Sequence, residues 1–147
     1  MKDCRLQQPK GETFQLKHNA ILTIASLFSI LLFTFHISED IVRGFEPGGF
    51  RHISGVAMVV VWLYGTLVLA GRRSGYIITL LGSLLGCLVL LVHMRGAGLV
   101  GGRIANSRGM LFWVWTLFTL GVSALFSAVL CVRGLWGLRR ARATEAE

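Results

Sequence analysis

The chain has 147 residues, of which 54% are hydrophobic, and its mean hydropathy is +0.66. A water-soluble domain of this length carries fewer apolar residues, so the composition excludes an ordinary soluble fold. The formal net charge of +8 would suit nucleic acid, but the basic residues lie at the borders of apolar segments rather than on one continuous face. We therefore expect the lipid bilayer, and no nucleic acid, as a partner.

Four long runs without Asp, Glu, Lys or Arg make up most of the chain. They cover about residues 19–38, 53–71, 74–94 and 109–132. A helix rises about 1.5 Å per residue and the hydrocarbon core is about 30 Å thick, so roughly 20 apolar residues cross it. The runs do not alternate polar and apolar residues, as strands of a membrane barrel would. The sequence thus predicts an all-α integral membrane four-helix bundle.

The runs divide the chain into an amino-terminal tail (1–18), a four-helix domain (19–133) and a polar tail (134–147). The first run is longer than the apolar part of a signal peptide and lacks a cleavage site, so we expect it to be retained. No helix breaker stands between it and Gly44, so the first helix is expected to continue to that glycine.

The basic residues indicate which side of the membrane each end occupies. Ten Lys and Arg residues precede the first run, fill the turn between the second and third runs, or follow the fourth, whereas five occupy the other two loops. Because cytoplasmic loops carry an excess of Lys and Arg, both termini are predicted to be cytoplasmic. The expected location is the plasma (inner) membrane.

Aromatic residues near the ends of the runs suggest interfacial belts. Trp113 and Trp115 lie near the outer end of the fourth run, and Tyr76 and Trp136 lie near inner ends. Trp62 lies in the middle of the second run and is expected to pack against a neighbouring helix.

Two pairs of small residues predict close helix crossings. Small residues four apart let helix backbones approach closely in lipid. The pairs are Gly82 with Gly86 and Ala124 with Ala128.

Three histidines lie at the predicted outer border. His36 ends the first run, His52 precedes the second and His93 ends the third, while Glu39 and Asp40 share a helix face with His36. Imidazoles with carboxylates suit zinc, copper or iron, and two facing histidines can bind haem. The candidate metal ligands are therefore His36, His52, His93, Glu39 and Asp40.

The same residues also fit ordinary interfacial positions, with Glu39 or Asp40 pairing with Arg43 one turn away. No ionisable side chain lies in the middle of a run, which argues against an ion-coupled transporter. We expect a binding module or an accessory subunit of a larger membrane complex that acts through its extracytoplasmic face. Its partners would be other membrane subunits or further copies of itself. The alternative is a metal- or haem-binding redox or enzymatic protein, and no catalytic motif decides between them.

Overall fold

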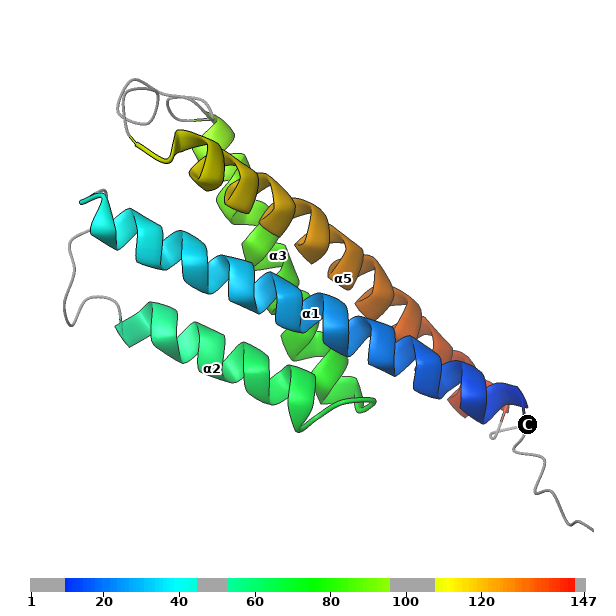
Figure 1. Cartoon of the computed structure of the whole chain (residues 1–147). Coiled ribbons are helices and arrows are strands. Elements are labelled where there is room, and N and C mark those ends of the chain that lie inside the picture. Colours follow the sequence, from blue (N-terminus) through cyan, green and yellow to red (C-terminus); the bar gives the residue numbers. More distant parts are fainter. Residues whose placement is uncertain (1–9, 45–52, 96–107, 145–147) are drawn as a thin grey trace, which may run out of the picture.

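The computed structural model of the chain describes residues 10–44, 53–95 and 108–144, which form four α-helices and no strand. The helices are α1 (Lys10–Val42), α2 (Ile53–Leu67), α3 (Arg73–Arg95) and α5 (Met110–Thr144). α1 packs on α2 and α5, and α3 closes the ring by packing on α2 and α5 (Figure 1). Successive helices run in opposite directions (Figure 1). The predicted all-α helical bundle is confirmed.

Three of the helices contain segments long and apolar enough to cross a membrane: Gln15–Val42, Arg73–Met94 and Met110–Arg140. Large apolar side chains also cover the outer faces, and Phe118, Leu125 and Phe126 are each more than half exposed. Such a surface suits lipid and is costly in water. The chain therefore has the features of a membrane protein.

α2 is shorter than the sequence suggests. It has 15 residues and ends at Leu67, so it rises about 22 Å, less than the hydrocarbon thickness. Residues 68–72 form the turn into α3, where Gly71 has a positive φ of +76° that side-chain-bearing residues rarely adopt. Residues 68–71 belong to the apolar run and were expected in the second span, but the structure places them in this turn. The crossing of the membrane by α2 stays a prediction.

Both long helices extend beyond their apolar runs. α1 begins at Lys10 inside the predicted tail, and α5 continues to Thr144 through most of the predicted polar tail. Leu, Arg and Ala favour helix, so the polar composition of this tail did not end the helix. α1 ends at Val42, and Gly44 has the positive φ expected of a helix-terminating glycine, as predicted.

The predicted close crossings join α3 to both of its neighbours. A Cβ atom added to Gly82 would lie 2.3 Å from the indole of Trp62, and one added to Gly86 would lie 2.9 Å from the Cβ of Ala124. Trp62 is 2% exposed, which confirms that it packs between helices.

Two of the four expected interfacial aromatic residues lie inside the bundle instead. Trp113 and Tyr76 are each only 1% exposed, so their assignment to interfacial belts was wrong. The Tyr76 hydroxyl contacts Asn19 of α1, and the indole N–H of Trp113 also has a partner on α1. A polar atom on each ring is thus satisfied inside the protein, which allows the whole ring to be buried.

Small hydroxyl side chains connect the helices in the middle of the bundle. Trp62 donates to Ser26, whose hydroxyl lies 2.8 Å from that of Thr66, and Ser29 donates to Ser123. Within lipid such groups need partners inside the protein. The bonds join α1 to α2 and to α5.

Candidate metal centre

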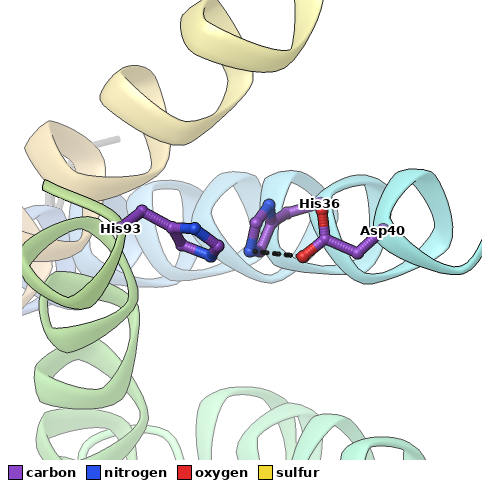
Figure 2. A group of neighbouring side chains, drawn as sticks. All are labelled: His36, Asp40 and His93. Carbon is purple, nitrogen blue, oxygen red and sulfur yellow. Dashed lines mark ion pairs between the residues drawn. The ribbon is translucent and has the colours of Figure 1, made fainter. Parts of the chain in front are cut away.

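The candidate site lies at the end of the bundle where α1 and α3 finish and α5 begins. His36 and Asp40 stand one turn apart on α1, so they share a face of that helix. His93 lies in the last turn of α3, and its ring points toward the ring of His36 (Figure 2). The His36 and His93 ring centroids are 4.9 Å apart, and the rings meet edge to face.

The three side chains bring their possible ligand atoms together. One nitrogen from each histidine and one carboxylate oxygen of Asp40 all lie within 4.8 Å of one another. Nε2 of His36 is 3.4 Å from Oδ2 of Asp40, the contact drawn in Figure 2. That separation is long for a hydrogen bond but close to the spacing of about 3.4 Å between two ligands of a tetrahedral zinc ion with bonds near 2.1 Å.

Trp113, in the first turn of α5, holds the carboxylate. Its indole N–H donates to Oδ1 of Asp40 at 2.9 Å, and its ring packs against both histidines, with centroid distances of 6.0 Å to His36 and 5.2 Å to His93. Asp40 is only 7% exposed. A buried carboxylate needs partners for its charge, and the indole orients one oxygen while leaving the other facing His36.

One ring nitrogen of the site is unsatisfied among the described residues. Nδ1 of His36 is buried and has no hydrogen-bond partner, and His36 as a whole is 4% exposed. Buried polar atoms are nearly always paired, so such an atom calls for an explanation. Because the contact with Asp40 uses Nε2 of His36, an ion held between these two side chains would not account for Nδ1.

Glu39, the other carboxylate predicted on this face, is held elsewhere. Its Oε1 accepts two hydrogen bonds from the guanidinium of Arg43, at 3.0 Å from Nε and 2.5 Å from Nη2. Glu39 therefore follows the simple i, i+4 pairing considered from the sequence and is absent from the cluster of ligand atoms. His52, the remaining predicted ligand, lies outside the described residues.

The donor set suits a single metal ion better than haem. Two imidazoles and a carboxylate are a common set for zinc and for non-haem iron. Haem ligated by two histidines lies between their rings, whereas the rings of His36 and His93 touch edge to face.

Sequence reasoning named His36, Asp40 and His93 as candidate ligands but did not place Trp113 beside them. The signal was present, because Trp113 lies near the start of the fourth run and Asp40 lies just after the end of the first, and both of these ends were predicted at the outer border. Residue order does not show which face of a helix a tryptophan occupies, so it was assigned to the lipid interface. The contact between α1 and α5 decides that it faces Asp40.

Comparisons with protein families, with curated proteins and with solved structures find no match to this chain.

Proposed function

We propose that this protein binds a zinc ion through His36, Asp40 and His93, near one face of the membrane. The observation that carries the proposal is the convergence of three ligand atoms, from two helices far apart in sequence, to within 4.8 Å of one another. Ordinary interfacial residues would be exposed, whereas His36 and Asp40 are buried and Trp113 orients the Asp40 carboxylate. In this proposal the protein is a binding module. Its ligand is the zinc ion itself or a molecule that coordinates the ion.

Zinc suits this arrangement for geometric reasons. Three protein ligands leave one position of a tetrahedral ion open, as in catalytic zinc sites, where water or a substrate group completes the coordination. Non-haem iron with the same ligands keeps up to three open positions, which a site packed under an indole accommodates less well. His52 directly precedes Ile53, the first residue of α2, in the sequence and stays a predicted fourth ligand.

The amount and environment of bound metal test the proposal directly. We expect the full chain, purified in detergent without chelators, to hold about one zinc ion per protein, measured by mass spectrometry of the metal. Replacement by Co²⁺ should produce visible absorption bands typical of tetrahedral coordination by nitrogen and oxygen. If the chain takes up no zinc or Co²⁺, the cluster only provides contacts that join α1, α3 and α5.

The proposal includes a location. The site would lie at the extracytoplasmic face of a multi-pass protein in the plasma (inner) membrane, because the opposite end carries most of the basic residues. A reporter fused after Glu147 should then be cytoplasmic, and one inserted at Gly48 extracytoplasmic. The reverse pattern would move the site to the cytoplasmic face. Association with other membrane subunits, or with further copies, remains a prediction.

A further inference from the structure

The end of the bundle opposite the metal centre carries a separate basic cavity. It has a volume of about 220 Å³ and lies between the first turns of α3 and the last turns of α5. Arginine side chains and apolar side chains line it together. The lining residues are Arg73, Ile77, Leu135, Leu138, Arg139 and Arg142.

The spacing of these residues explains the mixed lining. On α5 the four contributors stand at i, i+3, i+4 and i+7 and therefore form one stripe, and Arg73 and Ile77 on α3 are one turn apart. Leu135 and Leu138 pack against the buried cluster around Tyr76, so the apolar floor continues into the core of the bundle. The arginines are exposed and form the rim.

Among the residues whose side chains are described, no acid neutralises this rim. The carboxylates whose side chains are described belong to Glu39 and Asp40, at the other end of α1, and both are engaged there. Arg73 also opens α3, where the positive end of the helix dipole adds to the field of the three guanidinium groups. An anion in this cavity would therefore meet three positive charges over an apolar floor.

The exposed Trp136, next in sequence to the cavity-lining Leu135, indicates that the cavity lies at the level of lipid headgroups. Trp136 projects from α5 beside the cavity and is 60% exposed, and the guanidinium of Arg140 lies 4.5 Å from the centroid of its ring. Tryptophan concentrates at the boundary between acyl chains and headgroups. A molecule with a phosphate at this level and an apolar chain directed toward the bundle is a phospholipid.

We propose that the cavity binds the headgroup phosphate of an anionic phospholipid, with Arg73, Arg139 and Arg142 as its ligands and the upper part of an acyl chain against Ile77 and Leu138. Basic pockets between membrane helices recognise lipids in this way. Arginine suits the task because its planar fork contacts two phosphate oxygens at once. This site does not depend on the proposed metal centre.

Lipid retention by the full chain tests the proposal. The protein in detergent is titrated with phosphatidylglycerol or with phosphatidylcholine, and bound lipid is measured by native mass spectrometry. We expect preferential retention of phosphatidylglycerol and a loss of affinity of about fivefold for each of Arg73→Gln, Arg139→Gln and Arg142→Gln. Arg133→Gln is the matched control, because it removes the same charge from an exposed position of α5 outside the cavity.

Three results would overturn the proposal. Equal retention of the two lipids would exclude recognition of an anionic headgroup. A loss with Arg133→Gln as large as that with the cavity variants would indicate diffuse attraction to a basic surface. Displacement of the lipid by millimolar inorganic phosphate would identify a site for free phosphate. Circular dichroism of each variant shows whether the helices are intact, and the single substitutions at exposed positions leave the core unchanged.

Discussion

Replacing His36 or His93 with alanine is expected to abolish stoichiometric zinc binding, with an affinity loss of at least about 100-fold. Loss of an outer partner that only orients a ligand costs 10- to 100-fold in typical zinc sites, and removal of a ligand itself costs more. The measurement is zinc affinity in detergent by competition with a chelating dye. Asp40→Asn should also weaken binding, because it removes the negative charge while keeping an oxygen that can accept from Trp113.

His18→Ala is the control for these variants. His18 lies at the other end of the bundle, where its Nε2 is 3.1 Å from the backbone oxygen of Leu130. Its replacement removes a histidine without touching the cluster, so the zinc affinity should not change. If His18→Ala lowered zinc binding as much as His36→Ala, the metal would be bound nonspecifically by imidazoles. Unchanged binding in His36→Ala, His93→Ala and Asp40→Asn would show that the ion is held elsewhere.

Gly82→Ile is expected to destabilise the bundle by roughly 2–3 kcal/mol. A Cβ at this position would lie 2.3 Å from the Trp62 indole, so a branched side chain forces α2 and α3 apart. The indole also donates to Ser26, and the separation would therefore disturb the hydroxyl contacts that join α1 to α2. The measurement is the thermal unfolding midpoint in detergent.

Gly137→Ile makes the same chemical change in a different setting. A Cβ at Gly137 has no heavy atom within 4 Å among the described residues, so we expect little loss of stability. Equal unfolding midpoints for Gly82→Ile and Gly137→Ile would mean that the α2–α3 crossing does not contribute to stability. The pair thus separates close packing from the general effect of isoleucine in place of glycine.

The two proposed sites occupy opposite ends of the same helices. The metal centre lies where α1 and α3 end, and the basic cavity lies where α3 begins and α5 ends. The packed middle of the bundle contains small residues and hydroxyl groups rather than charges, because a charge at that depth is costly. Both proposed sites therefore lie at the ends, where water and headgroups can solvate charged groups.

The all-helical class, the helix end at Gly44 and the crossings at Gly82 and Gly86 follow from the sequence alone. Each of these features depends on a short stretch of sequence. A long apolar run favours a membrane-spanning helix, a glycine after a helix ends it, and a pair of small residues four apart allows a close helix crossing. The depth of the histidines also followed from topology, since successive apolar runs of similar length that cross the membrane in alternating directions return their ends to the same two borders. That reasoning correctly placed His36 and His93 at one end of the bundle.

Only the tertiary structure decided which side chains at that level face one another. Residue order specifies depth along a helix, but the rotation of each helix about its axis depends on packing against all its neighbours. That rotation turns His93 and Trp113 toward α1, leaves Glu39 with Arg43, and buries Tyr76. The length of α2 was also decided in three dimensions, because the turn at Gly71 ends an apolar run that by composition alone continues as helix.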